Sequence, residues 1–273
     1  MIRAGLLGVF FGMVTLAGWA QLDGPASTGV SASLIRLFGT NQNFTAQAEM
    51  QMLDHTNQEL LGVPMRFARA GNKIRVEVDL AQMRNKLHPD ATAQMRPLGL
   101  DQTVSIIRPE TRTNLICFPK LKACLQLRMP ANEADAFLKR ARVDRANLGR
   151  EKMQGYQCLK QRVTITDASG QKSEATVWVA PELRNFPVCV ATREKEGVVM
   201  MRFRQVKFDA VDAAQFEPPA GYASFTDLQM LIAGLGTQYM RANGTGLKSS
   251  SSAQTQTRSP ASRPATASRA RKK

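Results

Sequence analysis

The chain has 273 residues and a formal net charge of +15 at pH 7, with only two histidines and four cysteines. About 220 residues lie between the first 20 residues and the last 33. This length suits one all-β domain, which can bury a core without disulfides or a metal ion to stabilise it. His55 and His88 have no second His or Cys at ligand spacing, and no phosphate-binding glycine loop follows a strand. The sequence therefore argues against a metal site, a catalytic triad or a bound cofactor, and we expect no enzyme activity.

The first 20 residues have the layout of a secretory signal. A positive start at Arg3 precedes an apolar run from Ala4 to Gly18, and Gly18-Trp19-Ala20 places small residues before Gln21. This arrangement predicts a signal peptide over 1–20, cleaved after Ala20, and a periplasmic protein. An uncleaved anchor is the alternative, but the run is shorter than the roughly 20 apolar residues of a membrane span.

Strand-like alternation with a period of two dominates the domain predicted over 21–240. Apolar residues from Phe44 to Met52 alternate with Thr45 to Gln51, so one face of this strand is dry and the other wet. Similar patterns and turn signals predict ten strands. They lie near residues 44–52, 63–69, 74–78, 103–108, 113–118, 123–128, 159–165, 174–180, 188–192 and 198–208. Their short connections favour an antiparallel meander.

Helical patterns are fewer. They fall at Ser31–Phe38, Leu80–Leu87, Ala131–Arg142 and Thr226–Met240. A large curved sheet with one dry face needs helices to cover that face. The first and last of these helices are the expected lids, because each has an apolar stripe and lies outside the meander.

The cysteine count is even, and the predicted export leads to an oxidising compartment. Cys117 and Cys124 flank a hairpin tip and are expected to face each other across it. Cys158 and Cys189 share the wet face, and we expect them to pair where the intervening strand ends near Pro181. Four cysteines allow three pairings, so both disulfides are predictions.

Several segments resemble the periplasmic lipoprotein-carrier family, LolA and its relatives. The stretch from Ala210 to Gly221, with Asp212, Phe216 and Pro218-Pro219 in it, is similar to the C-terminal signature of that family. The stretches Gly149–Cys158 and Ala175–Leu183 resemble an uncharacterised, lipoprotein-sorting-like branch of the superfamily, and Phe44-Thr45-Ala46 resembles its first strand.

The resemblance implies a mainly β (α+β) fold, a curved antiparallel half-barrel of about ten or eleven strands with helices lidding the concave face. It also implies a lipid or acyl chain bound in that face. The four cysteines, the segment from Arg84 to Gln102 and the basic tail depart from the best-known carrier, which leaves the cargo undefined.

Apolar residues on the predicted dry faces are the candidates for the wall of an apolar cavity. Thirteen methionines favour a site that adapts to a flexible chain, although an ordinary filled core is the alternative for any one residue. The candidates are Met50, Met52, Met65, Phe67, Val76, Ile106, Leu115, Val177, Met201 and Phe203.

The last 33 residues, from Arg241 to Lys273, combine small and polar residues with eight basic residues and no acidic one. Such a segment buries too little apolar surface to fold, so a disordered tail over 241–273 is expected. Removing Arg3 and these eight residues from the total of +15 leaves +6 for the domain. A basic tail favours anionic membrane surfaces or wall polymers, and a solvated extension is the other interpretation.

The leading hypothesis is an exported, soluble binding or carrier protein for a lipid, an acylated protein or another amphiphile, and we expect it to be a monomer. The alternative is a non-catalytic envelope interaction protein that docks on anionic surfaces through its tail. Nucleic acid is not an expected partner.

Overall fold

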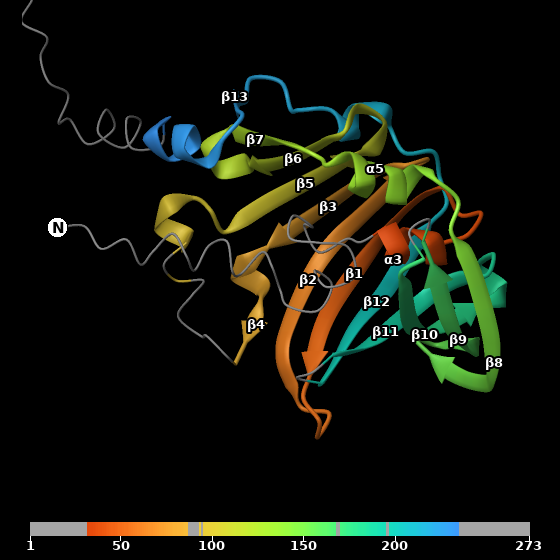
Figure 1. Ribbon diagram of the computed structural model, residues 1–273. Coiled ribbons are helices and arrows are strands. Elements are labelled where there is room, and N and C mark those ends of the chain that lie inside the picture. Colours follow the sequence, from red (N-terminus) through yellow and green to blue (C-terminus); the bar gives the residue numbers. More distant parts are fainter. Residues whose placement is uncertain (1–31, 87–92, 94, 168–169, 195–196, 235–273) are drawn as a thin grey trace, which may run out of the picture. The chain divides into compact units, whose positions relative to one another are not determined.

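One curved sheet organises the described part of the chain (Figure 1). The computed structural model describes residues 32–86, 93, 95–167, 170–194 and 197–234. The predicted signal peptide, His88 and the basic tail lie outside the described residues.

The sheet has 13 strands in the order β13-β7-β6-β5-β3-β2-β1-β12-β11-β10-β9-β8, with β4 beside β2. Their bounds are β1 Asn43–Leu53, β2 Glu59–Ala70, β3 Lys73–Asp79, β4 Arg84–Asn85, β5 Gln102–Arg108, β6 Thr113–Phe118, β7 Ala123–Arg128, β8 Arg142–Met153, β9 Tyr156–Thr166, β10 Lys172–Ala180, β11 Phe186–Glu194, β12 Gly197–Lys207 and β13 Ala223–Phe225. Every pairing is antiparallel except that of β13 with β7. The expected open, curved antiparallel sheet is confirmed, with more strands than predicted.

All ten predicted strands are present, and three others were missed. The most informative omission is β8, a 12-residue strand whose side chains are exposed on both faces. Without a dry face it has no alternation for a sequence pattern to detect. The other two, β4 and β13, have only two and three residues.

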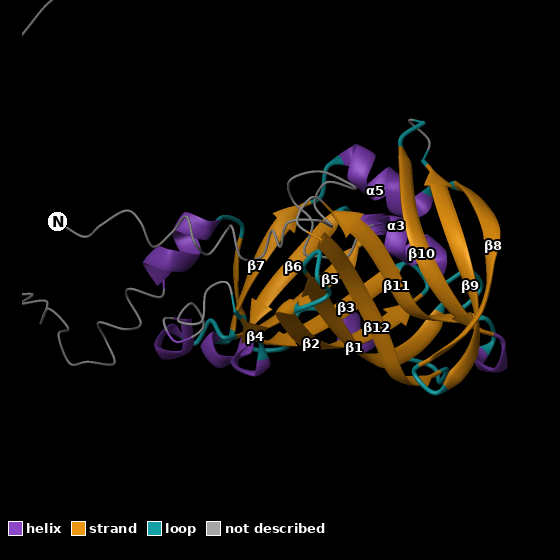
Figure 2. Ribbon diagram, turned by 90° about the horizontal axis from the view of Figure 1, so that it is seen from below, coloured by secondary structure: helices purple, strands orange, loops and turns teal. Residues whose placement is uncertain are grey.

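Helices α3 (Ala32–Leu37) and α5 (Ala131–Leu138) lie within the curve of the sheet (Figure 2). The prediction for α3 is confirmed, whereas α5 ends earlier than expected because the chain becomes extended at Lys139 and enters β8. The predicted helix Leu80–Leu87 is wrong: only a 3-10 turn, Leu80–Gln82, forms there. Its chain is instead drawn into β4, where Arg84 pairs with Gly62 of β2.

The strand registers divide the side chains into an inner face, which α3 and α5 cover, and an outer face. On β1, Ala48 and Met50 face inward beside Phe203 and Met201 of β12, while Glu49 faces outward beside Arg202. Inner-face residues of β1–β3 and β9–β12 form the main core with both helices. The alternation of β1 therefore has the orientation that the sequence predicted.

The chain after β12 crosses the outer face of β3 and β5 and then wraps around the β7 edge. Phe216, in the 3-10 turn Ala213–Phe216, is fully buried against Ile106, Leu115 and the β6–β7 cysteines. After β13, residues 228–234 are helical, and Leu231 packs in a cluster with Phe118, Ala123 and Leu125. Within the described residues the predicted Thr226–Met240 helix begins two residues later, at Leu228, and the part after residue 234 lies outside the described residues.

Candidate binding site

The inner face has two halves, and the first is closed by aromatic packing. Phe38, directly after α3, has ring centroids 4.9 to 5.7 Å from four phenylalanines. These are Phe44, Phe67, Phe186 and Phe203, all almost fully buried. Because their rings fill the space between α3 and the sheet, this half is a packed core.

Two arginines, the buried Arg69 and the half-buried Arg36, hold the helices over this half. Arg69 of β2 is 5% exposed, donates to the carbonyls of Ile35 and Asn41 at 3.4 and 3.3 Å, and lies against the Phe38 ring. Burial, and secondarily the charge of Arg36, lowers the pKa of Arg69 to about 10. Arg36 of α3 donates in turn to the carbonyls of Ala136 and Phe137, each at 2.9 Å, which have few partners within α5. Charge-assisted hydrogen bonds therefore attach α3 to the sheet and α5 to α3.

The second half of the inner face is rich in methionine and lies toward the other ends of β1 and β2. Met50 pairs with Val63 and Met201, and Met52 pairs with Leu61 and Val199. Met52, Met65, Val78 and Met83 are only partly buried there. We call the nine residues of this half the methionine surface. They are Met50, Met52, Leu61, Val63, Met65, Val78, Met83, Val199 and Met201.

Eight of the ten predicted wall residues lie on the inner face, and two do not. Met50, Met52, Met65 and Met201 belong to the methionine surface, Phe67 and Phe203 belong to the phenylalanine cluster, and Val76 and Val177 lie in the same core. Ile106 and Leu115 pair with each other across β5 and β6 on the outer face, beneath Phe216. Their placement on the cavity wall was wrong. Ile106 and Ile107 are both buried, on opposite faces of β5. The sequence therefore has no apolar–polar alternation there to indicate which of the two points inward.

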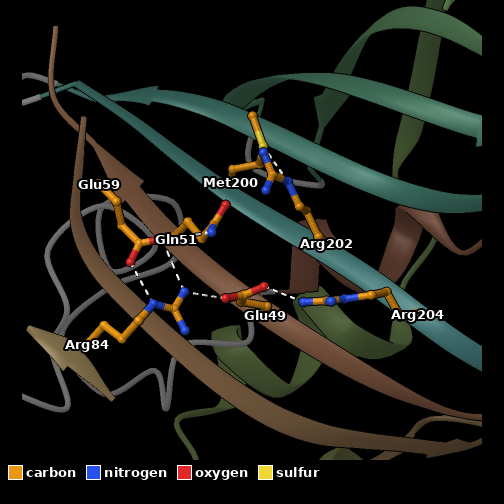
Figure 3. Close-up of polar contacts among 7 residues, drawn as sticks. All are labelled: Glu49, Gln51, Glu59, Arg84, Met200, Arg202 and Arg204. Atoms are coloured by element: carbon orange, nitrogen blue, oxygen red, sulfur yellow. Dashed lines mark hydrogen bonds and ion pairs between the residues drawn. The ribbon is translucent and has the colours of Figure 1, made fainter. Parts of the chain in front are cut away.

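The outer face of β1 carries a network of ion pairs that sequence patterns did not reveal (Figure 3). Glu49, whose side chain is 11% exposed, binds Arg84 of β4 through one oxygen and Arg204 of β12 through the other, the latter at 2.5 Å. Arg84 also binds Glu59 at 2.8 Å, and Gln51 donates to Glu59 at 2.8 Å. Residues up to 155 positions apart meet here, so local spacing held no trace of the network.

This network attaches β4 to the sheet, and arginines bind the carboxylates of both Glu49 and Glu59. The hydrogen bond from Arg84 is the largest cause that lowers the pKa of Glu59, and the same bond raises the pKa of Arg84. Both oxygens of Glu49 accept from guanidinium groups. Such a cluster stabilises and orients strands, and it offers no free carboxylate for acid–base chemistry.

The four cysteines follow one of the two predicted pairings. Cys117 and Cys124 form a disulfide across the β6–β7 hairpin. Cys158 and Cys189 are separate, buried thiols, so the second predicted disulfide is wrong. They belong to β9 and β11, and β10 lies between these strands with Trp178 opposite Cys189. Strands two apart are about 9–10 Å from each other, beyond the reach of a disulfide.

Among the described residues, no group of three or more His, Cys, Asp or Glu side chains is arranged to hold a metal ion, and His55 lies exposed in the turn after β1. No helix in the described ranges is long and apolar enough to cross a membrane.

Residues 62–186 match the model of a domain of unknown function, DUF4412. No curated protein matches the sequence. A LolA superfamily protein from Nitrosomonas europaea is 13% identical, over 69% of this chain and 98% of that one, with a TM-score of 0.33.

Two other similar structures have comparable scores. The lipoprotein LppX of Mycobacterium tuberculosis is 10% identical over 66% of this chain and 96% of its own, with a TM-score of 0.36. A putative outer membrane lipoprotein-sorting protein domain from Vibrio parahaemolyticus is 11% identical over 67% and 92%, with a TM-score of 0.32. These three proteins are similar to this chain over most of their own length. At these scores the likeness carries no argument about ligands.

Proposed function

We propose that this protein is an exported, periplasmic binding protein that holds an acyl chain of a lipid or acylated protein against the methionine surface. The observation that carries the proposal is the contrast between the two halves of the inner face. Phenylalanine rings close one half. Flexible methionines line the other, where Met50 and Met201 are buried but Met52, Met65 and Met83 are only partly buried. Methionine adapts to partners of no fixed shape, so this half suits an alkyl chain.

The physical driving force would be burial of apolar surface. Each methylene group of a bound chain contributes about 0.8 kcal/mol when it leaves water. Arg69 and Arg36 hold α3 and α5 at the phenylalanine half, so the rigid and adaptable parts of the inner face are separate. Non-covalent binding requires no catalytic group, and we propose a carrier rather than an enzyme.

A titration with a fluorescent fatty acid tests this proposal. Met52→Glu or Met65→Glu places a charge on the methionine surface, where an acyl chain would have to desolvate it. We expect at least about tenfold weaker binding, equivalent to about 1.4 kcal/mol. Thr176→Glu is the matched control, because Thr176 lies on the outer face of β10 opposite Arg162.

Phe67→Ala separates the two halves of the inner face in the same assay. It removes a ring from the closed cluster and should lower the free energy of unfolding by about 3–5 kcal/mol. At a temperature where this variant is folded, its probe affinity should stay close to that of the wild type. Absence of probe binding by the wild-type protein, or equal losses in Met52→Glu and Thr176→Glu, would contradict the proposal.

A further inference from the structure

A polar pocket of about 350 Å³ lies on the outer face of the sheet, over β12, β1, β2 and β3. These four strands run side by side in Figure 1. Thr45 and Gln47 of β1 line it together with Gln205 and Lys207 of β12, and Gln215 closes it from the segment after β12. The sheet separates this pocket from the methionine surface, so the two cannot hold parts of one short ligand.

A β-bulge in β12 builds the donor side of the pocket. Gln47 pairs with Arg204 and Thr45 pairs with Lys207. Between these two pairs β12 has two residues where β1 has one, which makes the bulge. Gln205 adopts a left-handed conformation there, with φ of 51°. Bulges redirect side chains, and this one places both Gln205 and Lys207 at the pocket. A left-handed glutamine costs conformational energy, which is often stored at functional sites.

The charges around the pocket favour an anion. Arg66, Arg75 and Lys207 line it with one carboxylate, Glu77, which gives a net charge of +2. Glu77 forms ion pairs with both arginines, at 2.9 Å to Arg66 and 2.8 Å to Arg75. Lys207 is exposed and makes no ion pair with any residue that the structure describes. Its ammonium group and the exposed Gln47 and Gln205 amides are thus available donors.

We propose that this pocket binds a phosphate monoester group. A phosphate monoester carries a charge of about −1.5 to −2 near pH 7, which matches the pocket better than one carboxylate does. Lys207 and the free edge of Arg66 would contact the phosphate oxygens, and the amides of Gln47 and Gln205 would donate hydrogen bonds to them. The volume is at the small end of the range for ligand pockets, about 300–1,000 Å³, and accommodates a small phosphorylated molecule or a lipid headgroup.

An NMR titration of the full chain with inorganic phosphate tests the site, and vesicles containing phosphatidic acid test the headgroup source. We expect phosphate to shift the amide signals around residues 45–47, 66–68, 75–77 and 205–207. Lys207→Gln should weaken the binding about tenfold, the value of one charge-assisted contact. Lys152→Gln, which removes an exposed lysine of β8, is the matched control.

Binding of phosphate in solution that is lost only in Lys207→Gln supports a soluble ligand. Tighter binding to phosphatidic acid vesicles than to phosphatidylglycerol vesicles of equal charge, with the difference lost only in Lys207→Gln, supports a headgroup rather than attraction of the basic tail. The inference is overturned if neither probe binds, or if Lys207→Gln and Lys152→Gln weaken binding equally. Because these readouts do not depend on fatty acid binding, they stand or fall separately from the proposed carrier function.

Discussion

Gly62 and Arg84 share one place on the outer face of the sheet: a Cβ atom at residue 62 would overlap the Arg84 guanidinium. The two residues are paired between β2 and β4. The missing side chain lets Arg84 reach across β2 to Glu49 of β1 as well as to Glu59. A glycine in the middle of a strand is thus explained by the ion pairs that pass over it.

Gly62→Ala should displace Arg84 and weaken its bonds to Glu49 and Glu59. The overlapping atoms belong to the end of a flexible side chain, so the fold should survive. We expect a loss of about 1–3 kcal/mol in the free energy of unfolding, measured by urea denaturation. In an Arg84→Ala background the same substitution should cost almost nothing. An equal cost in both backgrounds would show that the effect of Gly62→Ala does not pass through Arg84.

Glu59 gives the stability a dependence on acid pH. Arg84 lowers the pKa of Glu59 in the folded protein below its ordinary value of 4.5. A depressed carboxyl pKa stabilises the fold above the unfolded-state pKa, and this contribution disappears as the pH falls through the folded-state pKa. Thermal unfolding of wild type and Glu59→Gln should therefore differ at pH 7 and converge as the pH drops below 4.5. A difference that is constant across this range would contradict the ion-pair assignment.

The cysteines predict a simple thiol count. Protein purified without reductant should show two reactive thiols after denaturation, from Cys158 and Cys189, and almost none when folded, because both are buried. Burial raises the pKa of Cys189 to about 12, which further suppresses its reactivity. Reducing the Cys117–Cys124 disulfide should cost about 2–3 kcal/mol. A count of four thiols would contradict this disulfide, and a count of zero would show that Cys158 and Cys189 pair after all.

Deletion of residues 244–273 tests the alternative in which the basic tail docks on anionic surfaces. We expect the melting temperature to stay nearly unchanged. Salt-sensitive binding to anionic vesicles should fall, since each basic residue near such a surface contributes about 1 kcal/mol. Vesicle sedimentation at low and high salt measures the effect. Equal binding of the truncated and full-length chains would leave the tail as a solvated extension.

Sequence patterns predicted the fold where one side of a strand is wet and the other dry. Phe44 to Met52 alternate cleanly, and β1 has the expected orientation. The patterns failed for strands whose two faces are both buried or both exposed. The outer face of β5 is buried beneath the turn that contains Phe216, so Ile106 was assigned to the wrong side, and β8 is exposed on both faces.

The sites depend even more on long-range contacts. Met52, Met65 and Met83 are partly buried while Met50 and Met201 are buried, and a strand pattern does not contain this difference because it depends on what packs against the inner face. The Glu49–Arg204 ion pair and the pocket at Lys207 likewise need the β1–β12 register and its bulge. The alternation did, however, identify four of the nine residues of the methionine surface.

Mass spectrometry of an organic extract tests the central claim most directly. Protein purified from the compartment to which it is exported should carry a lipid or another acylated molecule in a near-stoichiometric amount. The Met52→Glu/Met65→Glu double variant should lose most of this ligand, while Thr176→Glu should retain it. An extract of folded wild-type protein that contains no acyl chain above the level of an unrelated exported protein would contradict the carrier function.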